Sequence, residues 1–266
     1  MQSIVYAYRM TQFTTETLEF IREELNSCIP QLSINCVIFR FDGEALQVAV
    51  VQQVHADMWT IPGGFVRQTE DIDLAAKRIL FEQTQLDNLL LSQFGTFGAA
   101  QREFAQEISR FSTLGFPEEL IKWISQRFVT IGYYSIVGQE QIGLETGPFF
   151  KEVKWINVLE SDHLAMDHPQ LVSEALLTLR SELQSRPLIT NFMPEIFTIP
   201  ELQKLFEAIL GRPVDRGNFR QRILKSKILI KIGQSKEKTG SRPPILYKLN
   251  EKKYLDSLTQ DVKLGF

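Results

Sequence analysis

The chain has 266 residues, of which 44% are hydrophobic and 23% charged. This composition is ordinary for a globular protein with a buried core and disfavours a disordered chain. No apolar run approaches the ~18 residues that a membrane-spanning helix needs, and the two cysteines, Cys28 and Cys36, do not form a CxxC motif. We therefore expect a cytoplasmic protein that neither crosses a membrane nor depends on disulfides.

Charge is unevenly distributed along the chain. The formal net charge is −3, yet residues 201–266 hold 15 Lys+Arg against 7 Asp+Glu. An acidic body with a basic C-terminal part predicts an anionic partner for that part. The alternative is a basic surface that is merely solvated.

The first 160 residues predict helices and strands in alternation. In chain order we expect a helix over 14–29, strands over 33–41 and 45–51 around a turn at 42–44, a short strand over 59–66 interrupted by Pro62-Gly63-Gly64, a helix over 70–84, strands over 93–97 and 128–137, and a short strand at 155–156. Residues 99–125 predict an irregular segment with a short helix. The inner side of the 70–84 helix is expected to carry Ile72, Ala75, Ala76, Ile79, Leu80 and Gln83.

The C-terminal part predicts a helix-turn-helix followed by a β-hairpin. After a helix over 169–183 and a linker over 184–196, Thr198 and Glu201 form a capping-box pattern that begins a helix ending at Gly211. Asp215 is expected to cap a second helix that continues to Lys225, and strands over 227–232 and 244–249 flank a basic loop. Two helices joined by a short turn, next to such a hairpin, are typical of a winged helix. A helical packing or dimerisation domain is the alternative.

The second helix has one side suited to DNA. A step of 100° per residue places Phe219, Ile223 and Ser226 toward the core. Asn and Gln read adenine edges and Arg reads guanine, whereas other basic side chains contact phosphates. The predicted DNA-binding residues are Arg212, Arg216, Asn218, Arg220, Gln221, Arg222 and Lys225, together with Lys236, Lys238 and Arg242 of the hairpin loop.

A glycine, a glutamate and an arginine in the first part of the chain have a recognisable spacing. Gly64, five residues, Glu70, seven residues and Arg78, followed by residues 79–86, resemble the Nudix box. That box continues after its arginine as Glu-apolar-any-Glu-Glu-any-Gly-apolar, and Ile79, Gln83 and Gln85 depart from it. The resemblance implies an α/β/α sandwich with a mixed sheet.

Nudix hydrolases cleave nucleoside diphosphate derivatives with magnesium or manganese, which need several oxygen ligands. Positions 79, 82 and 83 share one helical face, where only Glu82 remains a carboxylate. We therefore expect a domain without catalytic residues, metal or cofactor, with Mg²⁺ relevant only if hydrolysis persists. Carboxylates in the irregular segment are alternative ligands: Glu103, Glu107, Glu118 and Glu119. Gln85 in place of glycine predicts an altered helix end.

The order of a Nudix-like domain, a linking helix and a winged helix resembles the Nudix-related transcriptional regulators of bacteria. Residues 197–224 and 240–244 carry this resemblance most strongly. It implies a homodimer that binds double-stranded DNA and responds to a small-molecule effector, either an ADP-ribose-like nucleotide or a sugar. The effector is expected beside Gly63, Gly64, Glu70, Arg78 and Glu82.

The predicted fold is therefore α+β, with four parts: an N-terminal helical extension over 1–30, a Nudix-like sensing domain over 31–160, a linking helix and linker over 161–196, and a winged helix over 197–266. The predicted function is that of a ligand-responsive DNA-binding transcriptional regulator of sugar, NAD or nucleotide metabolism. One alternative is a Nudix pyrophosphohydrolase acting on a nucleoside diphosphate derivative such as ADP-ribose. Another is a protein-interaction module that has lost its ligand.

Overall fold

The computed structural model describes residues 19, 22–23, 25–53, 58–100, 109, 111–113, 116–138, 150–183, 189–235 and 243–259. The chain divides into two compact units. The first contains the described residues within Met1–Ile38, Val48–Ser135 and Gly143–Ala175, and the second those within Phe39–Gln47, Ile136–Ile142 and Leu176–Phe266. The boundary falls inside helix α5 (His168–Glu182). We describe each unit by itself.

A β-sheet provides the framework of the first part of the chain. Its main path has the order β3 (Trp59–Thr60), β2 (Leu46–Gln53), β1 (Cys28–Phe41), β6 (Val129–Val137), β5 (Ser92–Phe97), while β4 (Gly63–Arg67) pairs with β1 and β7 (Phe150–Asn157) pairs with β2. The 3-10 helix η2 (Val158–His163) follows β7. Strand β1 is buried on both faces from Ile34 to Phe39, as the central part of a strand covered by two layers should be.

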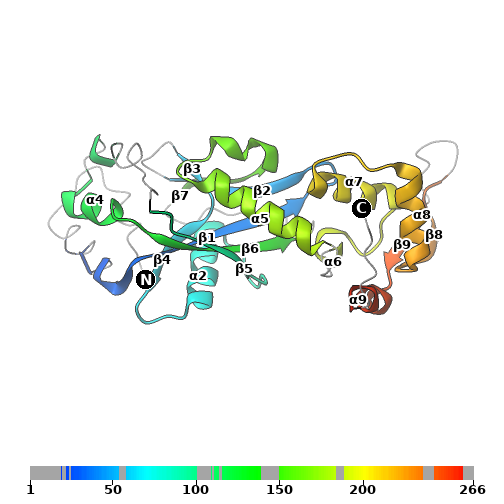
Figure 1. Ribbon diagram of the computed structural model, residues 1–266, viewed down its shortest axis with the longest axis horizontal. Coiled ribbons are helices and arrows are strands. Elements are labelled where there is room, and N and C mark those ends of the chain that lie inside the picture. The colour runs from blue at the N-terminus through cyan, green and yellow to red at the C-terminus, as the bar shows by residue number, and fades with distance from the viewer. Residues whose placement is uncertain are drawn as a thin grey trace. The chain divides into compact units, whose positions relative to one another are not determined.

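Helices cover opposite faces of this sheet. The Cys36 thiol lies 3.9 Å from the carbonyl oxygen of Ala76 on α2 (Ile72–Thr84), whereas the amide nitrogen of its neighbour Asn35 lies 3.4 Å from Nε2 of His168 in the first turn of α5. Successive residues of a strand point to opposite faces. The sheet is therefore sandwiched between α2 and the start of α5 (Figure 1), which confirms the predicted α/β/α architecture.

The strands and helices largely follow the sequence pattern, with a few differences. β1 begins at Cys28, directly after helical residues 25–27, so the predicted helix ends before Ile29. Most of that helix lies outside the described residues. Ile72 is 36% exposed and does not belong to the buried side of α2, where Thr84 takes a place instead.

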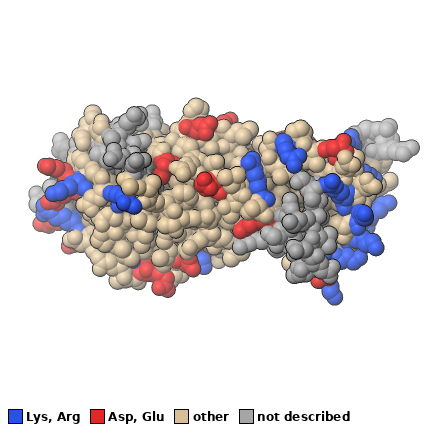
Figure 2. Space-filling model, viewed as in Figure 1, with Lys and Arg blue, Asp and Glu red and all other residues tan. Residues whose placement is uncertain are grey.

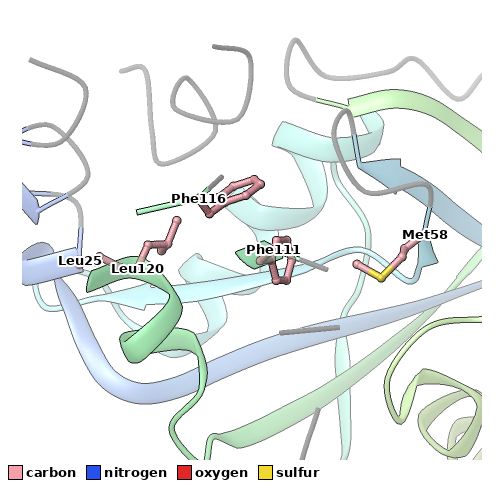
Figure 3. Packing of buried hydrophobic residues seen from close by; sticks show 5 residues of the cluster. All are labelled: Leu25, Met58, Phe111, Phe116 and Leu120. Atoms are coloured by element: carbon pink, nitrogen blue, oxygen red, sulfur yellow. The ribbon is translucent and has the colours of Figure 1, made fainter. Parts of the chain in front are cut away.

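A separate hydrophobic cluster joins residues of the irregular segment to Leu25 and Met58. It consists of Leu25, Met58, Phe111, Phe116 and Leu120, with Leu120 on helix α4 (Glu118–Ile124). Figure 3 shows these side chains arriving from segments far apart in sequence. Their burial packs the described residues Phe111, Phe116 and Leu120 of this segment against Leu25 and Met58.

The second unit contains the predicted pair of helices and the hairpin. Its elements are α6 (Ile189–Phe192), α7 (Ile199–Leu210), α8 (Arg216–Ser226), β8 (Leu229–Gln234), β9 (Ile245–Leu249) and α9 (Glu251–Thr259). Thr198 and Glu201 form the expected capping box, and Asp215 accepts a hydrogen bond from the Asn218 N–H at the start of α8. Helix α6 lies inside the stretch predicted as linker, and α9 has no counterpart among the predicted elements.

Candidate functional site

The Gly63-Gly64 pair begins strand β4 where three elements meet. Gly63 pairs with Asn35 and Gly64 with Ile34 of β1. A Cβ on Gly63 would lie 2.2 Å from the Asn35 amide nitrogen, and a Cβ on Gly64 would lie 3.2 Å from Cγ1 of Ile79. The glycines are therefore required by the close approach of β4 to β1 and to helix α2.

Gln83 is bonded to the backbone of this same strand. The Gly63 N–H donates to Oε1 of Gln83 at 3.1 Å, and Nε2 of Gln83 donates to the Gly63 carbonyl oxygen at 2.5 Å. The side chain is buried, with a residue exposure of 7%. A carboxylate can accept the first of these bonds but cannot donate the second. The amide at position 83 thus ties α2 to the glycine turn.

Glu70 and Arg78 form a partly buried ion pair beside this turn. Arg78 donates to both carboxylate oxygens of Glu70, at 2.8 and 2.5 Å, to the Phe65 carbonyl oxygen at 3.0 Å, and to Glu82 at 3.2 Å. Glu70 also accepts the Arg67 N–H at 2.8 Å. Burial raises the pKa of the Glu70 carboxyl, but the bonds from Arg78 and Arg67 outweigh it and leave this pKa below its ordinary value.

The predicted effector-site residues are thus brought together on β4, on the loop after it and on one face of α2. Their donor set does not fit a divalent cation. Ile79 is buried against Gly64, Gln83 is bonded to Gly63, and Glu82 is paired with Arg78. Among the described residues no group of three or more His, Cys, Asp or Glu side chains is placed to hold a metal ion.

Of the four alternative carboxylate ligands, the two that the structure describes do not join this donor set. Glu118 and Glu119 are exposed on α4, and Glu119 forms an ion pair with Arg22 at 2.6 Å. Glu103 and Glu107 lie outside the described residues.

The end of helix α2 differs from the sequence expectation. Gln85 adopts the left-handed conformation itself, with φ 57° and ψ 13°, and its N–H donates to the Phe81 carbonyl oxygen. The backbone geometry typical of a terminal glycine is therefore retained by a glutamine. A side chain in this conformation costs roughly 1 kcal/mol relative to glycine.

His168 is a residue of this region that the sequence pattern did not reveal. Its Nδ1 accepts the Ile61 N–H at 3.2 Å, and its Nε2 lies 3.4 Å from the amide nitrogen of Asn35, the residue that contacts Gly63. The ring is buried, with 5% exposure. His168 thus connects the β3–β4 turn and β1 to the first turn of α5. The pairing joins residues 133 positions apart, and no local pattern announces it.

In the second unit, helix α8 presents a basic surface. Phe219 and Ile223 are its buried residues, and Phe219 packs on Phe206 of α7 with ring centroids 5.3 Å apart. The exposed residues are Arg216, Gly217, Asn218, Arg220, Gln221, Arg222, Leu224 and Lys225, with Arg212 exposed in the preceding turn. Figure 2 shows Lys and Arg side chains gathered on the part of the second unit where α8 lies. Lys236, Lys238 and Arg242 of the hairpin loop lie outside the described residues.

The turn between α7 and α8 is held by side chains from two directions. Glu207 accepts the Val214 N–H at 2.9 Å, and Gln203 donates to the Val214 carbonyl oxygen at 3.0 Å. Arg180, near the end of α5, donates to the Ile209 carbonyl oxygen at 2.7 Å, where the last carbonyls of α7 need partners. The sequence pattern did not reveal Arg180. It makes the last turns of α5 part of the support of the helix-turn-helix.

Comparison with known proteins supports both halves of this description. The chain matches the NUDIX domain model over residues 29–174 and the model of the NrtR DNA-binding winged helix domain over residues 189–249. The chain belongs to the NUDIX family, and it carries a winged helix domain of the NrtR type. The predicted order of a Nudix-type domain and a winged helix is thereby confirmed.

Similar proteins match most of the length of this chain. A curated relative from Acinetobacter baylyi, named "ADPR responsive transcriptional repressor NtrR", is 29% identical over 231 residues, which are 82% of each chain. The crystal structure of Shewanella oneidensis NrtR complexed with a 27mer DNA has 26% identity and a TM-score of 0.60, covering 84% of this chain and 95% of that one. A MutT/nudix family protein from Enterococcus faecalis, 19% identical with a TM-score of 0.58 over 92% of this chain and 97% of that one, shares the fold.

Among the described residues, none of the helices is both long enough and apolar enough to span a bilayer.

Proposed function

We propose that this protein is an effector-responsive transcriptional regulator, in which the Nudix-type domain binds a nucleotide effector without hydrolysing it and the winged helix binds double-stranded DNA. The observation that carries the proposal is the combination of a basic, exposed α8 with a Nudix box whose metal-binding positions are occupied by other contacts. The relative named as an ADPR-responsive repressor supports the same combination.

The case against catalysis rests on the three positions of the metal-binding face. A bridging cation needs several hard oxygen ligands at once. Ile79 offers none, the Gln83 oxygen already accepts the Gly63 N–H, and Glu82 is neutralised by Arg78. We infer that the domain works without magnesium or any other cofactor and leaves its effector intact.

The effector that we propose is ADP-ribose or a closely related nucleoside diphosphate sugar. Two observations support this effector: the Acinetobacter relative is named as responsive to ADPR, and Nudix domains bind nucleoside diphosphate derivatives. Its site is the turn at Gly63 and Gly64 with the adjoining Glu70, Arg78 and Glu82. A free pentose is the competing effector and serves as a comparison in the test.

The DNA-binding residues that we propose divide by chemistry. Asn218 and Gln221 carry amides that read adenine edges, and Arg222 reads guanine. Arg212, Arg216, Arg220 and Lys225 neutralise phosphates, together with the loop residues Lys236, Lys238 and Arg242. We further propose that the protein acts as a cytoplasmic homodimer on a twofold-symmetric site, since twofold proteins read such sites.

Fluorescence anisotropy with the promoter duplex next to the protein's own gene tests this function. We expect specific binding whose logarithm falls linearly with the logarithm of salt concentration, and release of the duplex by ADP-ribose but not by ribose or arabinose. Arg220→Ala should weaken binding to all duplexes to a similar degree, whereas Gln221→Ala should reduce the preference for the specific one. A protein that ignores every duplex and instead cleaves ADP-ribose would overturn the proposal.

A further inference from the structure

Two residues on the exposed side of α8, Gly217 and Leu224, are neither polar nor charged. Leu224 is 40% exposed, although its neighbours on the helix surface are polar or charged. An exposed leucine alone is common. Its position inside a basic surface is informative, because apolar area is costly to leave in water next to strongly hydrated groups.

Gly217 is the second of these residues. It lies in the first turn of α8, where a glycine is less favourable than almost any other residue. A Cβ at this position would meet only the Asp215 carboxylate oxygen at 3.4 Å, which is an ordinary contact. Among the described residues no close packing requires the glycine, and its backbone is not left-handed.

Both residues fall on one line along the helix. Residues 217, 221 and 224 are spaced i, i+4 and i+7, which places Gly217, Gln221 and Leu224 in one stripe. The buried residues Phe219 and Ile223 lie on the other side. The stripe runs between basic side chains, namely Arg216, Arg220, Arg222 and Lys225.

We propose that the stripe of Gly217, Gln221 and Leu224 is the edge of α8 that reads DNA bases, with Leu224 contacting the 5-methyl group of a thymine. The inference rests on the proposed function and adds the class of base that is read. In the major groove the thymine methyl is the apolar group offered to a protein. A glycine on the same stripe lets the helix backbone approach the duplex closely, because no side chain intervenes. Among the flanking cations, Arg216, Arg220 and Lys225 match the phosphates on either side, which favours a duplex over a second copy of this chain as the occupant.

The test replaces thymine with deoxyuridine, which removes only the methyl group. The specific duplex is first selected from a random-sequence duplex library with the full-length protein, and each thymine is then replaced in turn. For the wild-type protein we expect at least one thymine whose replacement weakens binding about fourfold, the loss expected for one buried methyl group. Leu224→Ala should bind the thymine duplex about as weakly as the wild-type protein binds the deoxyuridine duplex. Replacing that thymine with deoxyuridine should not weaken the binding of Leu224→Ala further. Leu255→Ala, which alters a leucine 50% exposed on α9, should bind and respond as the wild type does.

Gly217→Ala gives an independent test, because it should raise the stability of the free protein and lower its affinity for DNA. Alanine should raise the Tm of the free protein, because the helix gains propensity, and should weaken binding of the selected duplex by at least tenfold. The inference is wrong if no thymine position responds in the wild-type protein, if Leu224→Ala keeps the wild-type response, or if Gly217→Ala binds DNA normally. If instead the wild-type protein selects no duplex at all, the proposed function itself fails and this inference falls with it.

Discussion

Replacing Gln83 by glutamate restores one carboxylate of the Nudix box, and we expect it to destabilise the protein. The substitution removes the donor that reaches the Gly63 carbonyl oxygen and places an acid against that oxygen at a buried site. Leaving a buried polar group unsatisfied costs about 1–3 kcal/mol, and partial ionisation of the new carboxyl adds to this. We expect a free energy of unfolding lower by about 2–4 kcal/mol at pH 8, and a Tm lower by roughly 10 °C.

The pH dependence of this loss distinguishes the mechanism. The new carboxyl has no cation partner among its contacts, so burial raises its folded-state pKa above the ordinary value of about 4.3. A raised pKa means that stability is retained below the ordinary value and lost as the pH rises through the folded value. Gln83→Glu should therefore be closer to the wild type at pH 4.5 than at pH 8.

Urea denaturation at both pH values measures the effect, and Gln85→Glu is the matched control. Gln85 also donates to a carbonyl oxygen, that of Phe81 at 2.9 Å, but this bond is exposed to solvent. We expect a loss of at most about 1 kcal/mol there, mainly from a negative charge at a helix C-terminus. If Gln83→Glu is as stable as the wild type at pH 8, or loses the same amount at both pH values, the structural role assigned to the amide is wrong.

Three further predictions follow from the same contacts. Glu70→Gln should lower the free energy of unfolding by about 2–3 kcal/mol at pH 7 because Arg78 loses its principal partner. Since the pKa of Glu70 is depressed, the difference from the wild type should shrink as the pH falls through that pKa. Urea titrations at several pH values measure this difference. Gln85→Gly should raise the free energy of unfolding by about 0.5–1 kcal/mol by relieving the left-handed conformation, and a lower or unchanged Tm would contradict that assignment. Burial raises the pKa of Cys36 to about 12, and burial together with Asp73 raises the pKa of Tyr133 to about 12. Because both groups favour the neutral form in the folded protein, the free energy of unfolding should decline from about pH 9 to about pH 12. Circular dichroism should show this decline beginning at a higher pH for Cys36→Ala.

The local sequence pattern was sufficient to predict the helices whose ends are marked by capping residues. The Thr198 and Glu201 capping box, the Asp215 cap and the terminal Gly211 all occur where the spacing indicated. Helix α6 was not predicted because it has only four residues and owes its order to burial of Ile189 and Phe192. Propensity is a weak guide for so short a segment.

Helix α9 was missed for a different reason. Asn250 accepts the Lys253 N–H at 3.1 Å and acts as its cap, and Tyr254 is buried. A polar capping residue before Glu251 was therefore present in the sequence, and α9 could have been predicted from this cap.

The candidate site was predictable where its contacts are local in sequence. The spacing of Glu70 and Arg78 indicated the Nudix box, and the two residues form an ion pair because the loop and the helix that carry them are adjacent in the chain. The bond from Gln83 to Gly63 depends on how α2 packs on β4, and the approach of His168 to Asn35 depends on the sheet and α5 together. Such contacts arise only when the tertiary fold is formed, so spacing alone could not predict them.

DNA binding and effector consumption followed in the same sample distinguish a ligand sensor from a hydrolase. ADP-ribose is added, with excess Mg²⁺, to the complex of the protein with its promoter duplex, while anisotropy reports bound DNA and chromatography reports ADP-ribose, AMP and ribose 5-phosphate. We predict that anisotropy falls to a stable plateau while the ADP-ribose remains intact. A fall followed by recovery, as AMP and ribose 5-phosphate accumulate, would show that the domain hydrolyses its effector and would contradict the account.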